Sequence, residues 1–156
     1  MNRLIMQTAS PKSNPKNRRW ARRFALQALY QWEVSKSDIN FIETQFLDDD
    51  NVGKVDWEYF KQILHGVPVH IEQIDKYIKR YINRKLSEVD PVELSALRVA
   101  TYELMERPDV PYRVILNEAL ELTKSFGATE GHKFVNGILD KIAKEVRNGE
   151  VTQFHG

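Results

Sequence analysis

The side chains that could do chemistry in this sequence are mainly cations, and they gather near its start. Residues 1–32 carry seven lysine and arginine residues and no acidic residue, whereas the rest of the chain carries 16 basic and 22 acidic residues. Four arginines stand close together, at Arg18, Arg19, Arg22 and Arg23. A basic segment on an acidic body predicts a polyanionic partner. A solvated basic tail would carry the same charge, and charge alone does not decide between the two.

The other polar candidates give little support to an enzyme or a metal site. The chain has no cysteine, which excludes thiolate metal sites and cysteine nucleophiles, and it lacks the P-loop, GxGxxG, HExxH and GxSxG motifs. His65 and His70 are too far apart in helical phase to share one face. Glu118 and Glu121 could form an acid–base pair, but exposed charges on a helix face explain them more simply. No catalytic residue, metal or cofactor is therefore expected.

Gln27 and Tyr30 lie on the same predicted helix as the arginines, near its cationic face. A tyrosine beside arginines can stack on a nucleobase and form a hydrogen bond with its edge. Tyr30 could equally be a half-buried core residue, because helical spacing places it beside the apolar stripe.

Lys133 and Phe134 fall in the first turn of another predicted helix, after two glycines. The free backbone N–H groups of a helix start can bind a phosphate. The alternative is a glycine-containing loop with Phe134 in the core. The residues alone favour a helical RNA-binding module and leave a protein–protein adaptor open.

Helical spacing of apolar residues places these candidates on an all-α fold. The chain has 156 residues, which favours one domain, and no segment alternates with the period of a strand or is apolar enough to span a membrane. The first helix is expected over about residues 17–35, with an apolar stripe from Trp20 to Trp32. Its arginines oppose the helix dipole, which is modest evidence that they serve a function.

Further helices follow, and both chain ends are expected to be unstructured. Residues 1–16 form a polar leader that contains prolines, and residues 148–156 form a loose tail. Pro68 should kink or break the third helical segment, because its ring clashes with the carbonyl of Leu64. The Asp-Pro-Val-Glu stretch from Asp90 has the residues of a helix start. The expected segments lie at about residues 38–47, 56–82, 91–106, 112–125 and 129–147.

Four longer stretches carry a family pattern. They are RRWARRFALQALYQWEVS at residues 18–35, YFKQILHGV at residues 59–67, LRVATYELMERPDVPYRVILNEALELTKSFG at residues 97–127 and HKFVNGILDKIA at residues 132–143. In this order they resemble the NusB transcription antitermination factor family. The resemblance covers roughly residues 18–147.

The resemblance implies a compact bundle of about six to seven helices in two three-helix subdomains, at about residues 17–85 and 86–147. It also implies a cytoplasmic factor without a cofactor. Together with NusE, a protein of the small ribosomal subunit, such a factor binds the single-stranded boxA RNA of ribosomal RNA operon leaders. The pair joins an RNA polymerase complex with NusA and NusG and suppresses premature termination, and NusE is expected on the C-terminal subdomain.

Matched position by position, the family pattern implies a set of RNA-binding residues in both halves. Arg18, Arg19 and Arg22 would hold phosphates. The rest of the set is Gln27, Tyr30, Glu93, Arg98, Phe126, Lys133 and Phe134. The chain departs from the pattern in three ways. Arg23 stands where the family often has glutamate, Trp20 stands where a further arginine is common, and the leader is longer than usual.

Two alternatives remain at this stage. The first is a NusB-like substrate-docking domain of a ribosomal RNA methyltransferase, which would be followed by a Rossmann-type catalytic domain. The sequence contains no βαβ pattern and no glycine-rich cofactor loop that would support it. The second is a ribosome-assembly adaptor.

Overall fold

The computed structural model describes residues 14–47, 52–127 and 130–155. These residues form helices and no strand, which confirms the all-α prediction. Residues 1–13 of the expected leader lie outside them, and its last residues already belong to the first helix. The elements are α2 (Pro15–Ser35), α3 (Ile39–Leu47), η2 (Val52–Lys54), α4 (Trp57–Val69), α5 (Ile71–Tyr81), η3 (Leu86–Glu88), α6 (Pro91–Glu106), α7 (Tyr112–Phe126), α8 (Gly131–Val146) and α9 (Asn148–His155).

α2 begins slightly earlier than expected because a cap and a proline lie just before its arginines. The side chain of Asn14 accepts a hydrogen bond from the backbone N–H of Lys16 at 2.7 Å. Pro15 occupies the first helical position, where its missing N–H costs nothing. The helix ends at Ser35 and is capped by Lys36, whose φ of 61° lies in the left-handed region.

The expected break near Pro68 is present, although it follows the proline instead of preceding it. α4 continues through Pro68 to Val69, and the chain turns at His70 before α5 begins. The N–H of His70 donates to the carbonyl of Gly66 at 3.0 Å. One predicted helical segment therefore becomes two helices.

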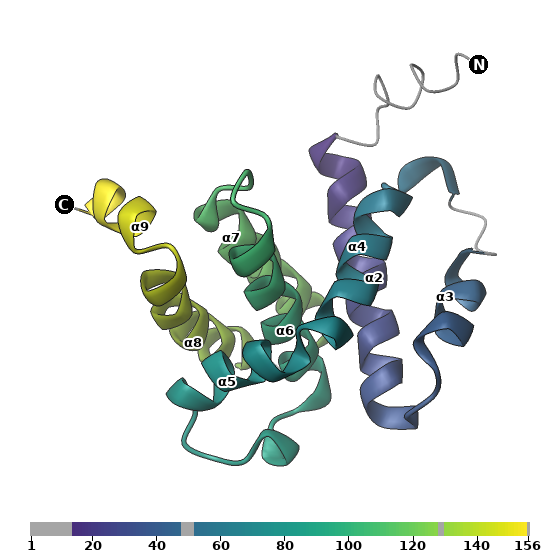
Figure 1. Cartoon of the computed structure of the whole chain (residues 1–156), viewed down its shortest axis with the longest axis horizontal. Coiled ribbons are helices and arrows are strands. Elements are labelled where there is room, and N and C mark those ends of the chain that lie inside the picture. Colours follow the sequence, from purple (N-terminus) through teal and green to yellow (C-terminus); the bar gives the residue numbers. More distant parts are fainter. Residues whose placement is uncertain (1–13, 48–51, 128–129, 156) are drawn as a thin grey trace.

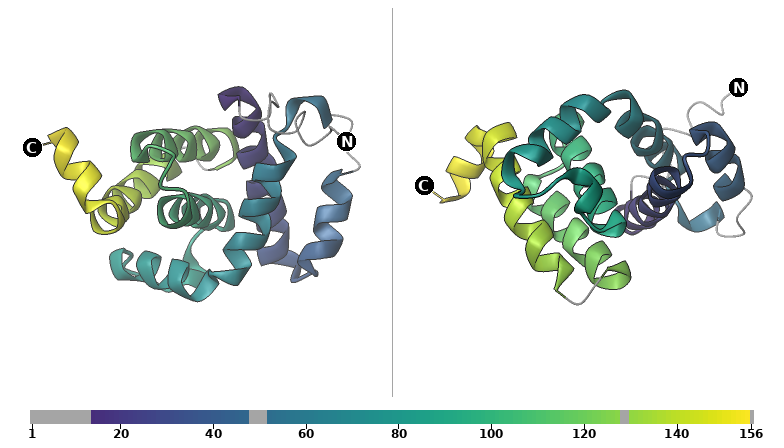
Figure 2. Two further views of the ribbon diagram at one scale, coloured as in Figure 1. Left: turned by 45° about the horizontal axis from the view of Figure 1, so that its top comes forward. Right: turned by 90° about the horizontal axis from the view of Figure 1, so that it is seen from below.

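α6 is the central helix, and its start is as predicted. The Asp90 side chain accepts hydrogen bonds from the N–H groups of Val92 and Glu93 at 3.0 and 3.1 Å. α2 and α4 contact α6 on one side, and α7 and α8 contact it on the other (Figures 1 and 2). Apolar side chains from both halves join one buried cluster around it.

The sequence predicted a loose C-terminal tail, and this prediction is wrong, because Asn148–His155 form α9. Val151 is buried, and the Glu150 carboxylate accepts hydrogen bonds from the Tyr112 N–H at 2.9 Å and from Arg147 Nη1 at 2.6 Å. These contacts attach a short polar helix to the start of α7. Figure 1 shows α9 and α3 at opposite sides of the molecule. Among the described helices, none has the length and apolar character needed to cross a membrane.

Candidate nucleic-acid interface

Helical geometry sends the arginines of α2 into different environments. Arg22 is only 3% exposed, and it donates two hydrogen bonds of 2.8 Å to the Glu103 carboxylate on α6. The hydroxyl of Tyr59 on α4 donates to the same carboxylate. Burial opposes the charge of Arg22, but Glu103 outweighs it and raises the pKa of the guanidinium. Arg22 therefore joins three helices and, contrary to the expectation, offers no exposed group to a phosphate.

Arg98 is also interior. Its guanidinium donates to Asp75 on α5 at 3.0 and 2.9 Å and to Glu33 on α2 at 2.7 Å. Burial works against the charge, and these two carboxylates raise the pKa of Arg98. The residue holds α2, α5 and α6 in register, and it is not among the groups that RNA could reach directly.

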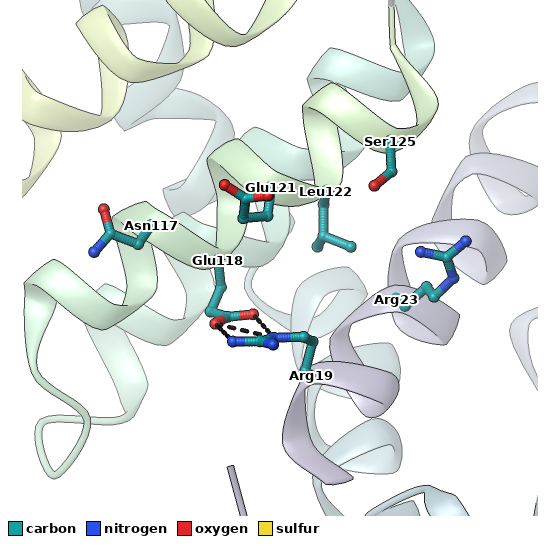
Figure 3. Close-up of a pocket in the computed structure, with 7 residues that line it drawn as sticks. All are labelled: Arg19, Arg23, Asn117, Glu118, Glu121, Leu122 and Ser125. Carbon is teal, nitrogen blue, oxygen red and sulfur yellow. Dashed lines mark hydrogen bonds and ion pairs between the residues drawn. The ribbon is translucent and has the colours of Figure 1, made fainter. Parts of the chain in front are cut away.

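Arg18 and Arg19 reach the surface. The Arg18 guanidinium lies 4.6 Å from the centre of the Tyr59 ring, and its Nε is 3.8 Å from Asp56. Arg19 points toward α7, where it donates to both oxygens of Glu118 at 3.0 and 2.9 Å (Figure 3). The side chain of Arg19 remains 63% exposed. Arg18 is half-buried, with a side chain 24% exposed, so Arg19 is the more accessible of the two cations.

From the sequence, Glu118 was expected to be an exposed charge on a helix face, but the structure places it in a largely enclosed position. Its side chain is 12% exposed and forms one wall of a pocket between α2 and α7 (Figure 3). The hydrogen bonds and charge of Glu118 raise the pKa of Arg19. Glu121, one turn further along α7, lines the same pocket.

Tyr30 and Gln27 lie one turn apart on α2. Tyr30 is 39% exposed, and Gln27 is half-buried. The geometry therefore favours the surface interpretation of Tyr30 over the core interpretation, because its ring has a face open to a partner. That Tyr30 stacks on a base remains a prediction.

Glu93 lies where α6 meets the start of α8. It is 8% exposed, and burial, together with nearby Asp90, raises the pKa of its carboxyl group. The carboxylate approaches Gly131 so closely that a Cβ at residue 131 would collide with it. Glu93 therefore positions the first turn of α8 and has little surface of its own.

Two arginines stack on the two phenylalanines of the predicted set. The guanidinium carbon of Arg23 lies 4.5 Å from the centre of the Phe126 ring, and that of Arg84 lies 4.5 Å from the centre of the Phe134 ring. Lys133 is exposed and pairs with Glu130 at 2.9 Å. Each arginine–phenylalanine pair places a cation on a flat ring, which is a combination that binds single-stranded nucleic acid.

Sequence reasoning missed Arg84 as a candidate. It lies in the connection after α5, outside any helix, and nothing in the local sequence pairs it with Phe134. Arg23 was noticed only as a departure from the family pattern. The signal available for Arg84 was its charge alone, which many surface residues share.

A small apolar cluster joins α2 to Phe126, whereas Phe134 packs against the main core. Leu26 of α2, Ala96 of α6 and Leu122 of α7 are buried together, with Val92 and Phe126 packed against them. The cluster sets α2 beside the start of α6 and the end of α7, while α8 begins next to Glu93. The exposed and half-buried groups around this junction form an aromatic surface, in which Tyr30, Arg84 and Lys133 are exposed and Arg23, Gln27, Phe126 and Phe134 are half-buried.

The aromatic surface has the chemistry of a binding site. Its rings and guanidinium planes can stack on bases, and its cations can bind phosphates. Among the described residues there is no cluster of histidine and carboxylate side chains that could hold a metal ion.

Comparison with known proteins identifies one family. The model of the NusB family matches residues 19–144. The transcription antitermination protein NusB of Pseudomonas entomophila (strain L48) is 52% identical over 143 residues, which are 92% of this chain and 86% of that protein. The protein of the same name from Legionella pneumophila (strain Corby) is 45% identical over 90% of this chain and 96% of its own length.

Solved structures give the same result. NusB of T. maritima superimposes with a TM-score of 0.71 at 34% identity and covers 81% of this chain and 90% of its own. NusB in a crystal structure of the antitermination factors NusB and NusE with dsRNA gives a TM-score of 0.76 at 27% identity, covering 83% of this chain and 97% of its own.

Proposed function

This chain belongs to the NusB family, and we propose that it is an RNA-binding transcription antitermination factor that recognises boxA RNA together with NusE. The observation that supports this most strongly is the family match across both halves of the chain, with the aromatic surface formed where those halves meet. A related structure holds NusB, NusE and RNA together, which supports both partners.

The aromatic surface indicates how RNA would bind. An unstacked base would lie on the ring of Tyr30, and the Arg23–Phe126 and Arg84–Phe134 pairs would add flat groups beside it. Phosphates would meet Arg19 and Lys133, the exposed cations at either end. Arg22 and Arg98 act indirectly, because their buried ion pairs hold α2, α4, α5 and α6 in place.

The bound RNA and NusE would then be presented to RNA polymerase together with NusA and NusG. In this proposal the chain works by binding, without catalysing a reaction, in the cytoplasm where transcription occurs. NusE would dock on the C-terminal subdomain. The methyltransferase alternative is not favoured, because antitermination factors match this chain over 86% and 96% of their own lengths.

The test is an RNA titration with boxA and with a scrambled RNA of the same composition, each with and without NusE. The chain is expected to prefer boxA and to bind it more tightly when NusE is present. Affinity should fall with salt, by about 0.7 in the log–log slope for each phosphate contact. Equal affinity for the two RNAs under both conditions would contradict the proposal.

A further inference from the structure

The pocket between α2 and α7 has a volume of about 570 Å³ and borders the aromatic surface (Figure 3). Arg19 and Arg23 of α2 face Asn117, Glu118, Glu121 and Ser125 of α7 across it. The lining is mixed, with Leu122 beside two cations, two carboxylates, a hydroxyl and an amide. Two carboxylates share the pocket with these cations: Glu118 pairs with Arg19, and Glu121 lies 3.9 Å from Lys124 on its own helix.

Arg23 is the arginine of this pocket that has no direct ion-pair partner among the described residues. By contrast, Arg19 pairs with Glu118 and Arg22 with Glu103. Its guanidinium stacks on Phe126, and this contact occupies a face of the group. The N–H groups lie in the guanidinium plane and remain suited to a phosphate.

Glu118 holds Arg19 in the way that a phosphate would. Its two oxygens accept two nearly parallel hydrogen bonds at 3.0 and 2.9 Å, and a phosphate can use the same fork of donors. The arginine is 63% exposed and can turn toward a ligand, but Glu118 is only 12% exposed and would lose its partner, so the exchange has to be compensated by the phosphate.

We infer that the α2–α7 pocket is a further RNA phosphate subsite, in which Arg23 binds the phosphate and Glu118 competes with it for Arg19. The inference rests on the proposed RNA-binding function, which it extends from the aromatic surface to α7. In the free protein Arg19 donates its hydrogen bonds to Glu118, and in the complex an RNA phosphate takes the place of Glu118 on Arg19. The competition weakens binding to any RNA that does not also engage the rings of the aromatic surface.

The experiment measures boxA affinity over a salt series for single variants and for one pair. Glu118→Gln keeps the shape of the side chain but removes its charge, so it is expected to tighten binding by roughly fivefold and to steepen the log–log slope by about 0.7. Arg23→Gln is expected to weaken binding and to flatten the slope by about 0.7. Glu121→Gln is the matched control, because it removes the same charge from the same pocket without releasing Arg19.

The pair Arg19→Gln with Glu118→Gln isolates the competition. If Glu118 acts through Arg19, the gain from Glu118→Gln disappears in the Arg19→Gln background. The inference is overturned if the gain survives there, if Glu121→Gln gives the same gain, or if Arg23→Gln binds like the parent chain. Thermal melts of every variant confirm that the compared proteins are folded.

The same titrations separate this inference from the proposed function. If the parent chain does not distinguish boxA from scrambled RNA, both are wrong. If the parent chain prefers boxA and Tyr30→Ala weakens that binding, but the pocket variants leave affinity and slope unchanged, only the phosphate subsite is wrong.

Discussion

Tyr30 is a large aromatic side chain left exposed on a helix that is otherwise well packed. It extends from a helix whose neighbouring residues Leu26 and Leu29 are buried, yet 39% of it is exposed. Such exposure of a large ring beside cations suits the stacking of a base. In α2, buried residues thus hold the helix in place while Tyr30 is left for a partner.

Tyr30→Ala is expected to cost about 1–3 kcal/mol of RNA binding, because a stacked base loses its platform. Tyr30→Phe should cost less, since the ring remains. A denaturant melt on the same proteins should show only a small change in the free energy of unfolding. The account of Tyr30 fails if the alanine variant is much less stable but binds boxA with unchanged affinity.

Arg22 and Arg19 make a second residue-scale comparison. Arg22→Ala should lower the free energy of unfolding by about 3–5 kcal/mol, because Glu103 would be left as an unpaired buried charge. Arg19→Ala should cost less, about 1 kcal/mol, since Arg19 is 63% exposed although its partner Glu118 is not. In RNA titrations Arg19→Ala should flatten the salt slope by about 0.7. Similar losses of stability in the two variants would contradict these assignments.

The charge pattern of the sequence located the correct region but could not assign each arginine. Arg19 is exposed, as a phosphate contact requires, whereas Arg22 is buried. The difference depends on Glu103, which stands 81 residues later and meets Arg22 only in the folded chain. The stacking of Arg84 on Phe134 was hidden for the same reason. Spacing within one helix predicts which face of the helix a residue lies on, but not which residue from a distant part of the sequence it contacts.

At the scale of elements, local sequence rules located the start of α6 and the interruption after α4. Asp90 caps α6, and Pro68 precedes the break at His70. The rules missed α9, because a segment of eight residues is a weak helix on its own. Its anchor is the hydrogen bond from the Tyr112 N–H to Glu150, a contact between distant segments.

Two helix glycines test whether packing overrides helix propensity. Gly66 in α4 lies against the ring of Tyr102, so that a Cβ at residue 66 would collide with it. Gly66→Ala should therefore destabilise the protein by about 1–3 kcal/mol, although alanine is the better helix former.

Gly137→Ala in α8 is the matched control, because a Cβ at residue 137 meets nothing within 4 Å. This variant should gain about 0.5–1 kcal/mol. Urea melts of both proteins check the pair. A stabilised Gly66→Ala variant would show that Tyr102 does not hold α4 in place.

At the scale of the whole molecule, α6 ties the two halves into one core. Buried side chains of α2, α4, α6, α7 and α8 belong to a single cluster, and the Arg98 ion pairs cross between the halves. The boundary between subdomains at about residue 85 remains a prediction. A shared core makes the relative position of the halves, and hence the aromatic surface between them, a property of the complete fold.

Unfolding should therefore be a single cooperative transition. The chain has three tryptophans, Trp20, Trp32 and Trp57, all in the first half, so fluorescence reports that half alone. Circular dichroism reports helices in both halves. The two urea curves are expected to coincide. A fluorescence transition at clearly lower urea than the dichroism transition would show that the halves unfold separately.

The central claim is that RNA lies across the aromatic surface, and NMR mapping of the boxA complex tests it most directly. Adding boxA should shift the backbone amide signals of Tyr30, Phe126 and Lys133 and leave those of α3 and α9 nearly unchanged, and scrambled RNA should give smaller shifts. Signals that move chiefly in α3 or α9, or that respond equally to both RNAs, would contradict the account.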